Sequence, residues 1–242
     1  MITTSRRSPA GSLVSIAIET GELDQGWCHT VGYLSPLVAA TVVAAHLSQR
    51  SLDGHRLGAL LAAGTRDEAA AEGIAGRLAD AAHLVVIASG ADRSAGRELV
   101  LKVEEASWLP SAFRDLETFL HGHLPATGPD TGLILVLADR DGRDARLATA
   151  RRALSAARII GVRTAAIIAA DIDGELDGDL TPAGRLLVAE AADLPAPTAA
   201  LIGTATPLQL VTERLARARG TNPDPIRRDD PVYRAAATAA DG

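Results

Sequence analysis

Three charged side chains occupy one row of a predicted helix, and their types could carry acid–base chemistry. Glu98, Lys102 and Glu105 are spaced by four and then three residues, which places them on one helix face. Leu99 and Val103 line the neighbouring face and are expected to point into the core. A carboxylate in a row that borders the core can act as a base. The same spacing is also typical of a surface row of ion pairs, so both interpretations stay open.

The cation in this row is unusual for the chain. Lys102 is the only lysine among 24 basic residues, and all the others are arginine. An ammonium is a compact point charge, whereas a guanidinium is planar and delocalised. The choice indicates that a cation of this particular shape matters at this position.

A glycine turn lies just before the predicted helix. The aliphatic run 84–88 reads as a strand that ends in Ser89 and Gly90, and a helix begins near Asp92. Ligands of open α/β sheets bind beyond the carboxyl ends of the strands, where helix N-termini offer free N–H groups to anions. Ser89 and Gly90 are therefore candidate binding residues, although an ordinary tight turn has the same sequence.

Two histidines flank a glycine further along the chain. His121 and His123 could form a metal pair, an acid–base site or an exposed turn. Glu117 precedes His121 by four residues, but no further ligand completes a zinc set. Acid–base use is the better functional interpretation, because histidine titrates near neutral pH. No metal site and no cofactor are expected.

Composition excludes several functional classes. The net charge is −6 with no basic stripe, and aromatic residues make up only 2%, so nucleic-acid binding is not expected. The apolar stretch 37–47 is too short to span a bilayer, so no membrane partner is expected either. A single cysteine, Cys28, excludes an internal disulfide and fits a reducing cytoplasm.

Strand and helix patterns alternate along most of the chain. This alternation with short connections predicts an α/β fold, a doubly wound parallel sheet with helices on both faces. Strands are predicted at 13–20, 84–88, 133–137, 164–169 and 185–189. Helices are predicted at 35–47, with Ser35 as N-cap and Pro36 at its first position, and at 57–63, 67–81, from 92, 143–159 and 197–219.

Two segments together resemble a known family. Residues 98–108 read ELVLKVEEASW and residues 116–122 read LETFLHG. They are similar to E-G-A-L-K-L-K-E-I-S-Y and G-E-L-K-H-G-P in the sugar isomerase (SIS) domains of glucosamine-6-phosphate synthase and its relatives. The two segments align without a gap, so Glu105 and His121 keep the family's separation.

Further likeness lies at both ends of the chain and in the same order. Residues 207–210 (PLQL) and 219–221 (RGT) resemble the family's P-L-Q-L and its R/K-G-T close. Residues 26–30 (GWCHT), with Tyr33, are similar to the segment G-V-A-S-T-K-A-Y. The likeness covers about residues 20–230.

The resemblance implies a fold and a division of the chain. The expected fold is the flavodoxin-like SIS fold. Residues 1–64 would be the C-terminal remnant of a first SIS lobe, 65–220 a complete second lobe and 221–242 a C-terminal tail. The family's phosphate-binding loop S-x-S-G-x-T belongs to the first lobe and has no counterpart in the sequence.

The resemblance also implies an activity and its residues. Family members interconvert aldose and ketose sugar phosphates through an enediol-type intermediate. By resemblance, Glu105 would be the base, His121 would assist ring opening from the neighbouring subunit of a homodimer, and Lys102 would line the site. Ser89, Gly90, His29 and Thr30 would contact a sugar phosphate or aminosugar phosphate.

One departure leaves the activity open. The family's imine-forming lysine falls at Pro231, so imine chemistry at that position is not expected. Three hypotheses follow: an isomerase, deaminase or deglycase of sugar or aminosugar 6-phosphates, a non-catalytic phosphosugar-binding regulatory module, or an inactive fragment.

Overall fold

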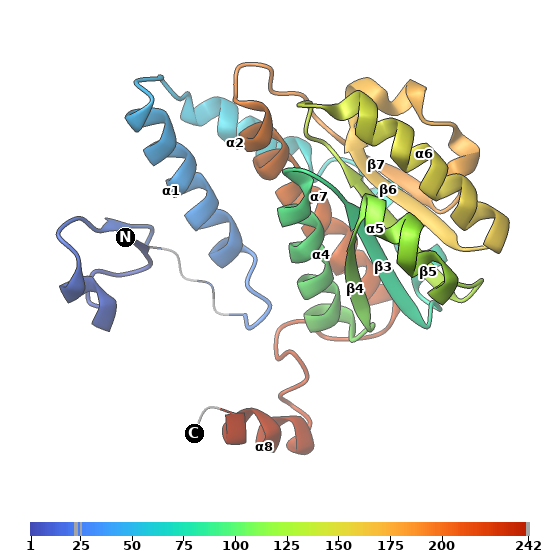
Figure 1. Ribbon diagram of the computed structural model, residues 1–242. Helices are drawn as coiled ribbons and strands as arrows, with labels where there is room; N and C mark the ends of the chain where they lie inside the picture. The colour runs from blue at the N-terminus through green and yellow to red at the C-terminus, as the bar shows by residue number, and fades with distance from the viewer. Residues whose placement is uncertain (22–23, 25, 241–242) are drawn as a thin grey trace.

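A parallel β-sheet forms the centre of the computed structural model, which describes residues 1–21, 24 and 26–240 (Figure 1). Within these residues the sheet has five strands in the order β4-β3-β5-β6-β7, and all neighbouring pairs run parallel. The strands are β3 (His83–Ala88), β4 (Ser111–Asp115), β5 (Thr131–Leu137), β6 (Arg163–Ala169) and β7 (Gly184–Val188). The prediction of a doubly wound parallel sheet is confirmed.

Helices cover both faces of this sheet (Figure 1). One face packs against α3 (Glu68–Leu78), α4 (Asp92–Ser107) and α7 (Ala196–Ala218). The other face packs against α5 (Leu116–Thr118) and α6 (Arg143–Ile160). Because side chains alternate along a strand, Val86 points into the first layer and Ile87 into the second. Burial on both faces explains why the central strands read as unbroken aliphatic runs.

The edge strand β4 was missed by the sequence analysis. Its residues include Arg114 and Asp115, and all five positions are only partly buried. An edge strand needs no continuous apolar run, so the aliphatic pattern that revealed the other strands is absent here. Because β3 pairs with both β4 and β5, the crevice between the carboxyl ends of β3 and β5 is the topological switch point.

The predicted strand at 13–20 is wrong. Pro9–Leu13 forms a short 3₁₀ helix, and within 13–20 only β2 (Ile18–Glu19) is a strand, paired in parallel with β1 (Ile2–Thr3). Leu13 and Ile16 are exposed. Their aliphatic side chains suit a strand, but β1, the strand that pairs with this segment, is only two residues long.

The first long helix begins earlier than predicted. Helix α1 (Val31–Leu47) starts four residues before Ser35, and Pro36 lies inside it. The Asp24 carboxylate accepts a hydrogen bond from the Gly32 N–H (2.9 Å), which satisfies a free donor of the first turn. This contact supports an extra helical turn before the proline.

The remaining elements connect and terminate the chain. Helix α2 (Gly54–Ala63) begins after Asp53, which caps it, and both α1 and α2 pack against α7. The tail carries a helix that was not predicted, α8 (Pro231–Ala240), which lies apart from the sheet (Figure 1). The short helical turns are Phe119–His123 (π), Leu124–Ala126, Ala170–Glu175 and Gly178–Leu180. The predicted boundaries after residues 64 and 220 stay predictions.

Across the described residues, no helix combines the length and apolar character needed to cross a membrane.

Candidate functional site

The charged row of α4 is buried at Lys102 and partly buried at Glu98 and Glu105. The Lys102 ammonium lies 2.8 Å from Oε2 of Glu105 and 3.7 Å from Oε1 of Glu98. The side chains of Lys102, Glu98 and Glu105 are 5%, 13% and 23% exposed, respectively. A surface row of ion pairs would be largely solvated, so the alternative of a row bordering the core is the correct one. Two carboxylates share one buried cation.

The N-terminal segment covers this row. Burial raises the pKa of the Cys28 thiol to about 11; Lys102 opposes the shift, while Glu105 adds to it by charge and by a side-chain hydrogen bond. Burial, followed by the charge of Glu98, raises the pKa of Tyr33. Burial also raises the pKa of Glu98, against the opposing charge of Lys102. Cys28 and Tyr33 therefore lie at the row, about 70 positions away from it along the chain.

The predicted binding residues of this segment lie at the start of α1. Thr30 precedes the helix, and its carbonyl oxygen accepts a hydrogen bond from Nε2 of Gln209 (3.1 Å). The exposed ring of His29 lies with its Nδ1 3.8 Å from Oδ2 of Asp24. His29 therefore contacts Asp24, and Thr30 contacts α7. Cys28 is the residue of this segment that contacts Glu105.

A groove opens beside the row. It is lined by Glu105 together with Leu101, Glu104, Trp108, Leu109, Pro110, Ile226, Arg227 and Tyr233, and its volume is about 530 Å³. The C-terminal tail forms one wall of this groove, and it also contacts the N-terminal segment, because the Trp27 N–H donates to the Asp224 carbonyl oxygen (3.1 Å). The groove therefore has a carboxylate and a guanidinium, Glu105 and Arg227, in its lining.

His121 lies at the opposite end of the strands from Glu105. It belongs to the π turn Phe119–His123, which follows α5 beyond the carboxyl end of β4, whereas Glu105 lies in the last turn of α4, before β4 begins. The five residues of β4 alone span about 17 Å. The His121 side chain is 77% exposed, and its Nε2 lies 3.5 Å from Oε2 of Glu117. One chain therefore does not bring His121 to Glu105.

The turn after β3 is filled by an arginine. Nη1 of Arg146 donates to the Ser89 carbonyl oxygen (3.2 Å) and to Oδ2 of Asp92 (2.9 Å). Gly90 has φ +64°, and a Cβ atom there would lie 3.2 Å from Nη1 of Arg146. The Ser89 hydroxyl donates to Oδ2 of Asp115 (2.9 Å). The backbone at this turn is thus engaged by the protein's own side chains.

Asp92 anchors this arrangement at the topological switch point. Its carboxylate is buried and accepts hydrogen bonds from the backbone N–H groups of Ala138 and Asp139. Burial raises the pKa of Asp92 to about 6, and the N–H of Asp139 and the charge of Arg146 oppose the shift. Asp92 is the first residue of α4 and Glu105 lies in its last turn, so the helix separates the two clusters by about 20 Å. Ser89 and Gly90 therefore do not share a site with Glu105 within one chain.

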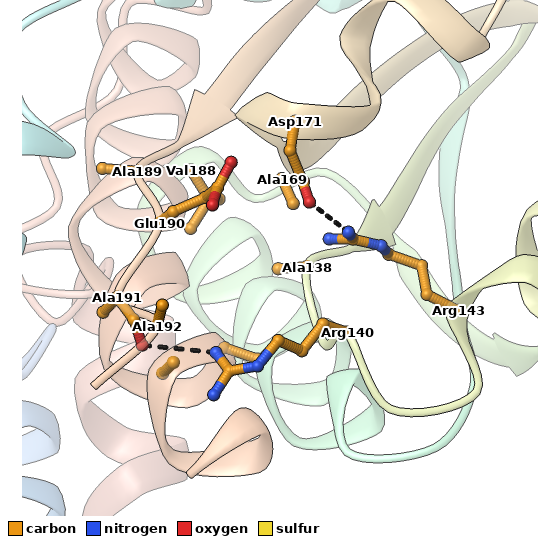
Figure 2. Close-up of a pocket in the computed structure, with 12 residues that line it drawn as sticks. Ala138, Arg140, Arg143, Ala169, Asp171, Val188, Ala189, Glu190, Ala191 and Ala192 are labelled. Carbon is orange, nitrogen blue, oxygen red and sulfur yellow. Dashed lines mark hydrogen bonds and ion pairs between the residues drawn. The ribbon is translucent and has the colours of Figure 1, made fainter. Parts of the chain in front are cut away.

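A second, smaller pocket lies beyond the carboxyl ends of β5, β6 and β7 (Figure 2). Its cations are already paired, since Arg140 donates to the Ala191 carbonyl oxygen (3.2 Å) and Arg143 forms an ion pair with Asp171. The pocket volume is about 40 Å³, on the scale of one or two water molecules. None of the residues predicted from the sequence lines it.

Comparison with known proteins identifies the fold. No protein-family model matches the chain, and no curated protein matches it in sequence. Solved structures do match. The C-terminal domain of glucosamine-fructose-6-phosphate aminotransferase from Francisella tularensis superposes with a TM-score of 0.75 at 19% identity, over 91% of this chain and 63% of that chain.

Two further structures show the same likeness. Tagatose-6-phosphate ketose/aldose isomerase from Escherichia coli has a TM-score of 0.72 at 20% identity, over 93% of this chain and 61% of that chain. Glucosamine-6-phosphate deaminase from Thermotoga maritima has a TM-score of 0.61 at 15% identity, over 93% and 63%. The chain spans less than two thirds of each, and it shares their fold. The SIS-type fold implied by the sequence resemblance is confirmed.

Proposed function

We propose that this chain binds a phosphorylated sugar or aminosugar and transfers a proton between its C1 and C2 atoms, with Glu105 as the base. The observation that carries the proposal is the Lys102–Glu105 pair, 2.8 Å apart and largely buried, at the edge of a groove. A carboxylate held in one orientation, partly shielded from water, is the group that proton abstraction beside a carbonyl requires.

The chemistry follows from the arrangement of the row. In the open-chain aldose, Glu105 would take the proton from C2 to give an enediolate, and the hydroxyl proton on O2 would pass to O1. The protonated Glu105 would then return its proton to C1, which gives the ketose. Lys102 is a positioning residue in this scheme, because its ammonium holds one Glu105 oxygen by a charge-assisted hydrogen bond. Glu98 lies on the other side of the same ammonium and helps to fix it.

Ring opening would be assisted by a second copy of the chain. His121 is exposed and far from Glu105 in one chain, so it is available to a neighbouring molecule. We therefore propose a homodimer in which His121 of each chain serves the Glu105 site of the other.

The comparisons support the substrate class. Structures that share the fold are named as a tagatose-6-phosphate isomerase, a glucosamine-6-phosphate deaminase and an aminotransferase domain for glucosamine and fructose 6-phosphate. All three names specify a hexose 6-phosphate or its amino derivative. We extend that class to this chain.

A non-catalytic phosphosugar-binding module is the second candidate. It is favoured by the separation of His121 from Glu105 and by Pro231, which begins α8 at the position of the family's imine-forming lysine. In that case, the groove would bind a sugar phosphate without exchanging its protons.

Solvent exchange distinguishes the two candidates. The chain is incubated in D₂O with fructose 6-phosphate or glucosamine 6-phosphate, and deuterium at C1 and C2 is followed by NMR. We expect exchange with the wild type and at least 100-fold slower exchange with Glu105→Gln. Glu72→Gln, which changes an exposed carboxylate on α3, is the matched control and retains full exchange.

Each outcome of this experiment decides something. Binding of either sugar phosphate without exchange favours the non-catalytic module. Exchange that survives Glu105→Gln assigns the base to another residue. Neither binding nor exchange, in a folded sample, refutes a phosphosugar site on this chain.

A further inference from the structure

The tail carries two consecutive arginines, and each lies over aromatic rings. The guanidinium carbon of Arg227 is 4.7 Å from the ring centroid of Trp108 and 4.0 Å from that of Tyr233. The guanidinium carbon of Arg228 is 3.7 Å from the ring centroid of Trp27. Both tryptophans of the chain therefore make cation–π contacts with arginines of the tail.

The Arg227 guanidinium has no polar partner within residues 1–21, 24 and 26–240. Its contacts there are the two rings, with no hydrogen bond or ion pair to a side chain or carbonyl. A guanidinium has five N–H donors. Other half-buried arginines use theirs: Arg219, for example, donates to the carbonyl oxygens of Ser107 (2.9 Å) and Ala79 (2.5 Å).

The aromatic support of Arg227 has an unusual backbone. Trp108 follows α4 in the left-handed region, with φ +53°, which is uncommon for a bulky residue. Arg227 itself has φ +66°. Strained residues persist where the surrounding structure fixes them, and they cluster at functional sites. Both strained residues line the groove that contains Glu105.

The carboxylates that line the groove already have partners, whereas one lining cation has none among the described residues. Glu105 is paired with Lys102, and Oε1 of Glu104 accepts a hydrogen bond from the Ser111 N–H (3.0 Å). Arg227 is the lining cation without a carboxylate partner among the described residues. The volume of about 530 Å³ lies within the range of small-molecule sites.

We propose that Arg227 is an anion-binding residue of this groove and receives the phosphate group of the sugar phosphate whose carbon chain reaches Glu105. The two rings fix the guanidinium plane, and its free N–H groups present a fork that matches two phosphate oxygens. The identity of the anion rests on the proposed function, whereas the anion site rests on the tail and groove alone.

The competing role for Arg227 is structural. Cation–π contacts with Trp108 and Tyr233 would then serve only to tie α8 to the end of α4. This role predicts a loss of stability on substitution without a change in ligand affinity. The two roles are therefore separated by measuring affinity and melting temperature on the same variants.

Affinity is measured by titrating inorganic phosphate, fructose 6-phosphate and unphosphorylated fructose, followed by the fluorescence of Trp108 in a Trp27→Phe background. We expect saturable changes with phosphate and fructose 6-phosphate, and none with fructose. Arg227→Gln should weaken the binding of fructose 6-phosphate roughly ten- to hundredfold, and Arg227→Lys should weaken it less. Arg217→Gln removes the same charge from an exposed position on α7 and should leave the affinity unchanged.

The outcomes separate this proposal from the proton transfer. Unchanged affinity in Arg227→Gln, with or without a lower melting temperature, overturns the anion site. Phosphate binding that depends on Arg227, with no deuterium exchange at C1 or C2, supports the anion site and refutes the catalytic function. Exchange with an unaltered KM in Arg227→Gln supports the catalytic function and refutes the anion site.

Discussion

The ammonium of Lys102 lies 2.8 Å from Oε2 of Glu105, and the lysine side chain is only 5% exposed. A second carboxylate, Glu98, lies 3.7 Å from the same nitrogen. Two partly buried carboxylates therefore depend on one buried cation. Such an arrangement is costly to bury and very sensitive to the loss of one member.

Removal of the cation should destabilise the fold. Lys102→Met leaves Glu98 and Glu105 without a buried counter-charge, and the expected loss in the free energy of unfolding is about 3–5 kcal/mol. Urea denaturation measures this loss. The double variant Lys102→Met, Glu98→Gln should recover part of it, because one of the two uncompensated carboxylates is removed.

A matched surface pair provides the control. Arg217→Met breaks the ion pair with Glu213, but Arg217 is 73% exposed, so the expected change is below about 1 kcal/mol. Equal losses for Lys102→Met and Arg217→Met would show that the α4 row is solvated after all.

The thiol of Cys28 should react slowly with disulfide reagents. Burial, together with the nearby Glu105 carboxylate, raises its pKa to about 11, so at pH 8 almost none of it is thiolate. Glu105→Gln removes the negative charge and should speed the reaction several-fold at the same pH. Stopped-flow kinetics with a chromogenic disulfide from pH 7 to 10 tests this prediction. Identical rates in both proteins would place the thiol away from Glu105.

The contribution of Asp92 to the stability of the fold should be larger in acid, because protonation relieves the cost of burying its charge. Burial raises the pKa of Asp92 from 3.8 to about 6, so between about pH 4 and pH 6 the folded chain binds more protons there than the unfolded chain. The contribution of Asp92 to the free energy of unfolding therefore falls as the pH rises through this window.

Asp92→Asn removes this titration. The difference in the free energy of unfolding between the wild type and Asp92→Asn should thus be more favourable to the wild type at pH 4.5 than at pH 6.5. Chemical denaturation at both pH values provides the comparison, and a difference independent of pH would count against a raised pKa.

Complementation tests the proposed exchange of His121 between chains. Glu105→Gln and His121→Ala should each be inactive alone, but a mixed dimer would contain one intact pair. An equal mixture, unfolded and refolded together, should regain roughly a quarter of the wild-type activity. Two inactive variants that regain no activity, despite demonstrated mixed dimers, would show that His121 does not serve the Glu105 site of the other chain. An active His121→Ala would place His121 outside the active site.

Much of the sheet could be predicted because its strands are buried on both faces. The runs 84–88, 133–137 and 164–169 are aliphatic except for Thr164, and they lie within observed strands. The same criterion failed at 13–20, where aliphatic residues are exposed, and at β4, where a strand contains charged ones. A run of aliphatic residues therefore predicts a strand only where the run is buried and a neighbouring strand is present to pair with it.

The candidate site was only half visible in the sequence. Helical spacing placed Glu98, Lys102 and Glu105 in one row, because that relationship is local. The contact between Cys28 and Glu105 and the engagement of the Ser89–Gly90 turn by Arg146 join residues more than 50 positions apart. Periodicity carries no information about such pairs, since they depend on how whole elements pack.

Because Lys102 is the only lysine, cleavage after this residue can be used to measure the opening of α4. A protease that cleaves only after lysine has one internal target in this sequence, the bond after Lys102. That bond lies in the middle of a hydrogen-bonded helix with the lysine side chain buried, so cleavage requires α4 to open. Digestion should give two fragments at a rate set by the population of the opened state. A ligand that binds at the end of α4 and stabilises the helix would then lower the rate of cleavage after Lys102. This measurement needs no label and no assay of turnover.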